Sequence, residues 1–187
     1  SLEAAEANYT AHNNPKTLKY FRTFKTHLES RSTFKTRMNG APFFSIYNVG
    51  EYSFAPYKVI WAEMTGNFCA AVVSGGAVPT LGKRPYIADH KLYFADFKTP
   101  APAYYLCGLL HSEIVKEMIE AHNVSTNMGD IFKHVTLPAY SATDAKHAQL
   151  VELVKAAHGQ HDERTRAKTV AQVRALAAKI ITAEIAA

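Results

Sequence analysis

The sequence has 187 residues, a length that suits one domain or one domain with a helical appendage. Its hydrophobic content of 48% provides for a core, and 20% charged residues is ordinary for a soluble protein. The formal charge of +5 permits binding to nucleic acid without establishing it.

Membrane and secretory segments are excluded by the pattern of apolar residues. No run approaches the roughly 18–20 apolar residues that span a bilayer. The first six residues are acidic and helix-prone, unlike a secretory signal. Cys69 and Cys107 each lie inside an apolar run, which predicts two buried free thiols in a reducing cytoplasm. We therefore expect a cytoplasmic protein.

The first forty residues contain a basic segment. Residues 1–14 are interpreted as a linker or cloning remnant, and the absence of an initiator Met suggests a domain cut from a larger enzyme. An amphipathic helix is predicted to begin at Pro15. Between Pro15 and Gly40 the sequence has seven Lys or Arg residues and a single acidic residue, Glu29. This strip is either a solvated face or a surface that contacts phosphates.

Residues 41–74 are predicted to form β structure. Runs of aromatic and β-branched residues indicate strands at 43–47, 57–61 and 68–73, the last apolar throughout and therefore expected to be buried on both faces. Gly75 and Gly76 end the third strand. The segment 75–84 is a candidate loop for entering a DNA groove, and a solvated loop is the alternative.

The second half of the chain is predicted to be mainly helical. A short aromatic strand is followed by Pro100 and Pro102, which suit the start of an apolar helix. Ser112 and Asp162 are expected N-caps. The remaining predicted elements are a helix at 113–122, a polar loop at 123–130, a strand at 131–137 ended by Pro138, a helix at 144–158 and a last helix at 162–187 that must dock on this domain or on a partner.

No catalytic or metal-binding motif is found in the sequence. His111-Ser112-Glu113 imitates the His-x-Glu of zinc deaminases, but no Pro-Cys-x-x-Cys follows to supply the other ligands. The eight prolines are never adjacent, so the chain lacks the Asn/Asp-Pro-Pro-Tyr/Phe loop that holds a flipped adenine. We expect no catalytic residue and no metal here.

Two stretches resemble one protein family. The first is Asp89-His90-Lys91, an aromatic strand, the run Ala103 to Leu110 and then Ser112. The second is a Tyr-x-Phe-x-x-Tyr-Lys-Val-x-Trp pattern at residues 52–61. Together they resemble the target-recognition (specificity) domain of adenine-specific DNA methyltransferases of the Taq type and of related restriction-modification enzymes. The resemblance covers residues 16–158, and it departs at His111, where the family usually has Asn.

The resemblance implies an α+β fold: a twisted mixed β region flanked by helices, with a C-terminal helical extension. It implies a DNA target-recognition domain at 15–159, a C-terminal helix at 160–187, and binding to double-stranded DNA beside a missing catalytic domain of the same chain. That domain would hold S-adenosylmethionine, and this fragment no cofactor. His147 matches a family His and is interpreted as structural. The candidate DNA-contacting residues are Lys16, Lys19, Arg22, Lys25, Arg31, Arg37, Tyr52, Lys58, Lys83, Arg84, His90 and Lys91.

Two other functions fit the same sequence. One is a module of a restriction-system specificity subunit, in which long helices such as 162–187 act as spacers. The other is a protein-interaction module without DNA, whose basic face merely keeps it soluble.

Overall fold

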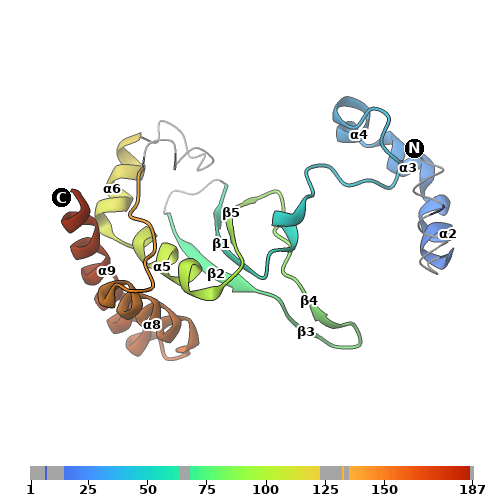
Figure 1. The fold of residues 1–187 in the computed structure, drawn as a ribbon. Helices are drawn as coiled ribbons and strands as arrows, with labels where there is room; N and C mark the ends of the chain where they lie inside the picture. Colours follow the sequence, from blue (N-terminus) through green and yellow to red (C-terminus); the bar gives the residue numbers. More distant parts are fainter. Residues whose placement is uncertain (1–6, 8–14, 64–67, 123–131, 133–134, 186–187) are drawn as a thin grey trace. The chain divides into compact units, whose positions relative to one another are not determined.

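The computed structural model of the chain describes residues 7, 15–63, 68–122, 132 and 135–185. It separates into two compact units, residues 1–50 and 51–187 (Figure 1). The boundaries predicted from the sequence do not include this division at Gly50. The predicted loop at 123–130 and the expectations for residues 1–14 fall almost wholly outside the described residues.

The first unit consists of short helices followed by turns. Its helices are α2 (Pro15–Thr23), α3 (Lys25–Ser30) and α4 (Ser32–Arg37). The strand predicted at 43–47 is wrong, because this segment forms turns. Its aromatic residues pack on the helices instead, with Phe43 buried and the Phe44 ring stacked 5.7 Å from that of Phe21.

The second unit is built on a three-stranded antiparallel sheet. The 3₁₀ helix η1 (Glu51–Phe54) leads into β1 (Tyr57–Ala62), which lies between β2 (Ala70–Ser74) and β5 (Leu92–Phe97). These strands and the helices confirm the α+β class, but the strand pairs of the described sheets are antiparallel and not mixed.

Burial alternates along these strands. Val59 and Trp61 of β1 belong to the main core, whereas Lys58 points to the opposite face of the sheet, as the period of a strand requires. In β2, Ala70 and Val72 are buried but Ala71 and Val73 are only half-buried, so the prediction of a strand buried on both faces is wrong.

A second, two-stranded sheet follows β2 directly. Strands β3 (Gly76–Val78) and β4 (Gly82–Arg84) form an antiparallel hairpin in which Val78 pairs with Gly82. The strands are close at the base, since a Cβ on Gly75 would lie 2.4 Å from the carbonyl oxygen of Arg84. At the tip, Thr80 adopts φ of 65°, an unusual conformation for a β-branched residue. The hairpin extends away from α6, α8 and α9 (Figure 1).

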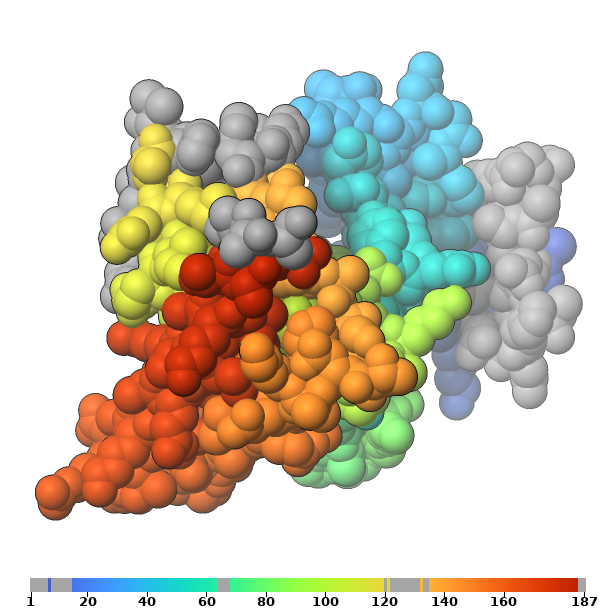
Figure 2. All heavy atoms as spheres, turned by 60° about the vertical axis from the view of Figure 1, so that its left-hand side comes forward, coloured from blue at the N-terminus to red at the C-terminus, as the bar shows by residue number. Residues whose placement is uncertain are grey.

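The described α-helices of this unit are α5 (Pro100–Leu110), α6 (Glu113–His122), α8 (Ala145–Gly159) and α9 (Glu163–Ile185). Helix α5 covers one face of the main sheet, and the other described α-helices of this unit pack around α5. Helix α5 begins at the predicted prolines and packs on the sheet, α8 and α9. The last helix docks within this unit, where α9 lies along α8 (Figure 2).

The N-cap predicted at Asp162 is confirmed, and Asp144 caps α8 although the prediction places it inside that helix. The Asp144 carboxylate accepts hydrogen bonds from the backbone N–H groups of Lys146 (2.7 Å) and His147 (3.2 Å), and Asp162 accepts one from Thr165 (2.7 Å). The bonds to Asp144 lower the pKa of its carboxyl, and hydrogen bonds from the side chain and the backbone N–H of Thr165 lower the pKa of Asp162, because they stabilise the charged carboxylates. Ser112 precedes α6 as predicted, but its buried hydroxyl makes no hydrogen bond to the described residues.

The strand predicted at 131–137 is wrong where the structure describes it. Residues 135–138 form neither strand nor helix, although Val135 is buried in the core. Residues 131, 133 and 134 lie outside the described residues. Among the described residues, no helix combines the length and apolarity needed to cross a membrane.

Helix α5 approaches α8 closely at Gly108, which makes this glycine sensitive to substitution. A Cβ there would lie 2.8 Å from Cγ of Leu150 and 3.0 Å from Cγ2 of Val154. We expect Gly108→Ala to reduce the free energy of unfolding by about 1–3 kcal/mol through overpacking, measured by urea denaturation. Gly159→Ala, with no atom within 4 Å of the added Cβ, is the control. Equal stability of the two variants would contradict the close packing.

Candidate nucleic-acid interface

The β3–β4 hairpin carries basic and apolar side chains that are open to solvent. Lys83 and Arg84 lie on β4 and are exposed. Around them lies a group of exposed large apolar side chains, which is unusual on a soluble surface outside a binding site. We call this group, with Lys83 and Arg84, the hairpin surface; its apolar members are Phe54, Val78, Leu81, Tyr86 and Ile87.

A cavity of about 350 Å³ lies at the base of the hairpin. One wall comes from Phe54, Pro56 and Tyr57, around the end of η1 and the start of β1. The structure thus brings the predicted Lys83 and Arg84 together with aromatic residues of the 52–61 motif. The other lining residues are Ser74, Gly75 and Pro85. This cavity could not be predicted from the sequence, because its walls come from segments that are distant in the chain.

Lys58 occupies a position that differs from the predicted DNA contact. Its side chain is 1% exposed, and its ammonium donates to the carbonyl oxygens of Ala55 and Tyr86, each at 2.8 Å. The ammonium also lies 5.7 Å from the centre of the Phe94 ring. Burial lowers the pKa of Lys58, while the charge of Asp96, its partner in the β1–β5 register, acts in the opposite direction.

The buried ammonium of Lys58 therefore joins two segments that flank the hairpin cavity. Ala55 lies between the lining residues Phe54 and Pro56, and Tyr86 follows the lining residue Pro85. In this position the Lys58 ammonium is directed at backbone carbonyls beside the cavity walls, and its contact with DNA stays a prediction.

Arg31 has a comparable internal role in the first unit. Its guanidinium donates to the carbonyl oxygens of Leu28 (2.7 Å), Phe43 (2.9 Å) and Ser45 (3.0 Å). These bonds hold the 43–45 turn on the helices and take up carbonyls that a strand partner would otherwise use. Arg31 is half-buried, and its donors are directed into the unit.

The other predicted basic residues of the first unit are exposed. Lys25 is 3.8 Å from the Glu29 carboxylate, and the Arg37 guanidinium lies 5.5 Å from the centre of the Tyr47 ring. Both contacts are at the surface and leave these cations open to a partner. The exposed members are Lys16, Lys19, Arg22, Lys25 and Arg37.

Three further predicted residues lie in the second unit outside β4. His90 is exposed and 2.6 Å from the Asp89 carboxylate, and Lys91 is 3.6 Å from Glu63. The Tyr52 ring is 6.0 Å from that of Phe94 on the outer face of the sheet. All three are accessible, and their contact with DNA stays a prediction.

Two histidines that sequence reasoning did not select lie at the free edge of β2. His111 Nε2 lies 2.9 Å from the carbonyl oxygen of Ala70, and the Val72 N–H donates to His158 Nε2 at 3.1 Å. These bonds occupy backbone groups that an edge strand otherwise offers to other chains. Burial is the main cause that lowers the pKa of His111, so the ring is neutral at pH 7.

The two cysteines flank the same edge, and they differ. Burial raises the pKa of Cys107 to about 12, which makes its thiol inert. Cys69 is exposed, so the prediction of a buried thiol is wrong at this position.

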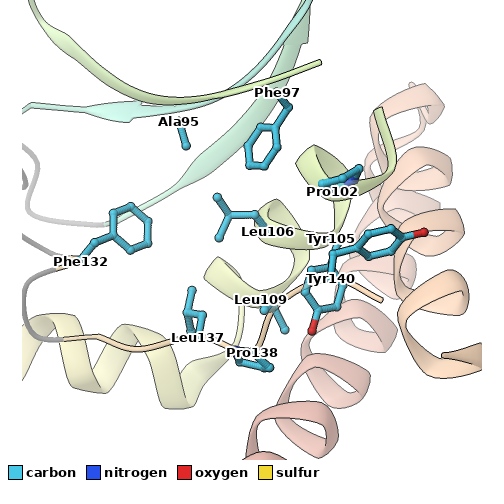
Figure 3. Close-up of a pocket in the computed structure, with 10 residues that line it drawn as sticks. All are labelled: Ala95, Phe97, Pro102, Tyr105, Leu106, Leu109, Phe132, Leu137, Pro138 and Tyr140. Atoms are coloured by element: carbon cyan, nitrogen blue, oxygen red, sulfur yellow. The ribbon is translucent and has the colours of Figure 1, made fainter. Parts of the chain in front are cut away.

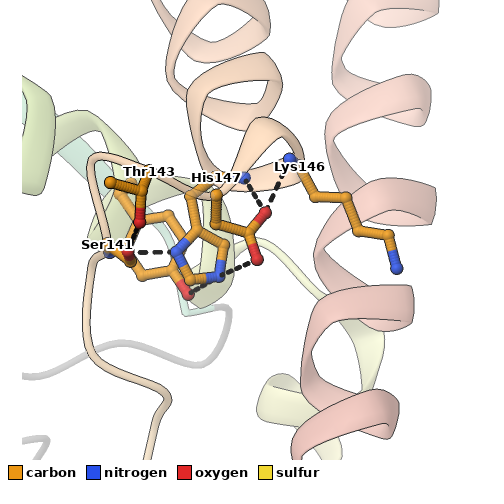
Figure 4. A network of polar contacts seen from close by, with 6 residues as sticks. Ser141, Thr143, Lys146 and His147 are labelled. Atoms are coloured by element: carbon orange, nitrogen blue, oxygen red, sulfur yellow. Dashed lines mark hydrogen bonds and ion pairs between the residues drawn. The ribbon is translucent and has the colours of Figure 1, made fainter.

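His147 lies in a polar network at the start of α8 (Figure 4). Its Nδ1 accepts a hydrogen bond from the Ser141 N–H at 3.0 Å, so Nε2 carries the proton and faces the Tyr105 hydroxyl at 3.2 Å. Burial is the main cause that raises the pKa of Tyr105 to about 12. These contacts fix the 141–147 turn against α5, in keeping with a structural interpretation of His147.

A larger cavity of about 390 Å³ lies between β5, α5 and the 137–140 segment (Figure 3). Phe97 and Leu106 lie on facing sides of it, with Leu137 and Pro138 below. No charged residue lines it in the described part of the chain. Among the residues that the structure places, no group of three His, Cys, Asp or Glu could hold a metal ion.

Comparison with known proteins yields a distant relationship to restriction-modification methyltransferases. The chain is 28% identical over 103 residues to the type II methyltransferase M.NspV of Nostoc sp.. The match covers 55% of this chain and 20% of that methyltransferase, so the chain corresponds to a small part of its relative. No protein-family model matches the sequence.

The internal role of Lys58 leads to a test that separates packing from DNA contact. Lys58→Met leaves the carbonyls of Ala55 and Tyr86 without donors, so we expect a loss of stability on the order of 2 kcal/mol. Thermal unfolding measures it, with the exposed Lys98→Met as control. Unchanged stability together with weaker DNA binding would show that the ammonium reaches DNA instead.

The lowered pKa of His111 predicts a pH dependence of stability. The unfolded chain binds a proton at the usual pKa of about 6.5 before folded His111 does, so stability is complete above this pH and declines as the pH falls below it. We expect the free energy of unfolding to decrease between pH 7 and 5. His111→Gln should flatten this slope, measured by urea denaturation at several pH values, whereas exposed His161→Gln should not. An identical slope in both variants would contradict the assignment.

Proposed function

We propose that this chain is the DNA-recognition part of an adenine-specific DNA methyltransferase of a restriction-modification system, and that its second unit is a target-recognition domain. The observation that carries the proposal is the exposed hairpin with Lys83 and Arg84 beside aromatic side chains. The similarity to a type II methyltransferase supports the same class of protein.

The geometry of the hairpin suits this role. A two-stranded β-ribbon fits the major groove of B-form DNA, where base edges can be read. Arg84 and Lys83 are long enough to reach either guanine edges or phosphates from β4, and arginine paired with guanine is the commonest specific contact. The exposed basic residues of α2 to α4, among them Lys19 and Lys25, provide phosphate contacts that set position without reading sequence.

Methylation would require a further domain. In this proposal the catalytic domain lies elsewhere in the same protein, holds S-adenosylmethionine and takes the adenine, while the present chain binds no cofactor. The present chain supplies the affinity for DNA and the selection of the target sequence. A spacer role for the last helix, as in a specificity subunit, has less support, because Val173, Ala177 and Ile180 of α9 are buried in the core of this unit.

A protein-interaction module is the second candidate. The exposed Val78, Leu81 and Ile87 of the hairpin surface favour it, since apolar side chains of this size also mark protein interfaces. The salt dependence of binding distinguishes the two functions, because DNA binding releases counterions and is strongly weakened by salt.

The test is a titration of duplex DNA with the whole chain at several salt concentrations. We expect a linear fall of log affinity with log salt, and we expect Lys83→Ala or Arg84→Ala to reduce the slope by about one where the side chain contacts a phosphate. Lys146→Ala, an exposed lysine on α8, serves as control. Absent or salt-independent binding by the folded chain would contradict the proposal.

A further inference from the structure

The cavity at the base of the β3–β4 hairpin combines an aromatic face with two cations. The Phe54 side chain is 57% exposed although it lines the cavity. Lys83 and Arg84 line the same cavity, and no carboxylate is found among its described lining residues. An open aromatic face beside positive charge is the arrangement with which proteins bind unpaired nucleotides.

Resting on the proposed function, we propose that this cavity holds one unstacked nucleotide of DNA. The base lies against the Phe54 ring, and Lys83 and Arg84 pair with the phosphates on either side of it. A volume of about 350 Å³ lies within the range of small-molecule sites. The cavity thus accepts a single nucleotide, while the hairpin beyond it contacts the duplex.

The walls of the cavity are held in place before any ligand binds. Lys58 joins Ala55, which lies between Phe54 and Pro56, to Tyr86, which follows Pro85. On the third side, the close approach of Gly75 to the Arg84 carbonyl fixes the base of the hairpin. A site fixed in this way loses little conformational entropy on binding, which favours affinity.

The lining also predicts how selective the site is. Besides the two cations, Ser74 provides a side-chain hydroxyl, and Tyr57 adds a second aromatic residue. Stacking on an aromatic ring accepts every base, because each has a π face. The site therefore binds an unpaired nucleotide with little preference for the base, and sequence choice is left to the rest of the hairpin.

The experiment compares the whole chain on two DNA duplexes by fluorescence anisotropy. One duplex is fully paired, and the other has the same sequence with one extrahelical nucleotide. We expect the second to bind more tightly, and Phe54→Ala to abolish the difference with a loss of about 5- to 150-fold in affinity for it, the range that stacking of one base provides. Phe54→Trp should retain the preference. Ile46→Ala, which removes an exposed apolar side chain outside both the cavity and the hairpin surface, is the matched control.

The outcomes separate this inference from the proposed function. Equal affinity for the two duplexes, still dependent on Lys83 and Arg84, would overturn the nucleotide site and leave the DNA-recognition role standing. The same holds if the preference survives Phe54→Ala with the variant shown to be folded by thermal unfolding. Binding to neither duplex would overturn both. A preference lost in Phe54→Ala and kept in Phe54→Trp and Ile46→Ala supports the site.

Discussion

Burial of helix α5 is the constraint on which the second unit depends. Ala103, Cys107 and Leu109 are fully buried, and the helix lies between the main sheet on one side and α8 and α9 on the other. Gly108 makes the contact with α8 possible because it leaves room for Leu150 and Val154. With its apolar surface satisfied on this side, the sheet can present the region around η1 and the hairpin to a partner.

The elements with a strong local signal could be predicted from the sequence. Pro100 and Pro102 mark the change from strand to helix α5, and the Asp162 carboxylate caps α9 as predicted. Strand β1 follows from its run of β-branched and aromatic residues. The strand predicted from the aromatic run at Phe43 is wrong because the same residue types also occur in turns. Here tertiary contacts, among them the bond from Arg31 to the Phe43 carbonyl, hold the turn.

The candidate site was harder to predict because the charge of a residue does not indicate whether its side chain points into the protein or to the surface. Arg31 and Lys58 are basic residues in basic or motif-bearing segments, yet their donors satisfy backbone carbonyls inside the protein. Among the described residues, the side chains of Lys83 and Arg84 make no hydrogen bond to a segment distant in the sequence, and both are exposed. Which carbonyls lack a donor is a property of the folded chain, so composition and spacing could not separate the two groups.

The way in which the hairpin is anchored bears on how such a surface can change during evolution. The base of the hairpin is held by the close approach of Gly75 to the Arg84 carbonyl and by the hydrogen bonds from Lys58 to two backbone carbonyls. Neither contact involves the side chains between residues 77 and 83. Those side chains are exposed and contribute nothing to the core. Substitutions at the tip are therefore expected to leave the sheet beneath it folded, so the sequence of the hairpin surface can vary while its anchor stays the same.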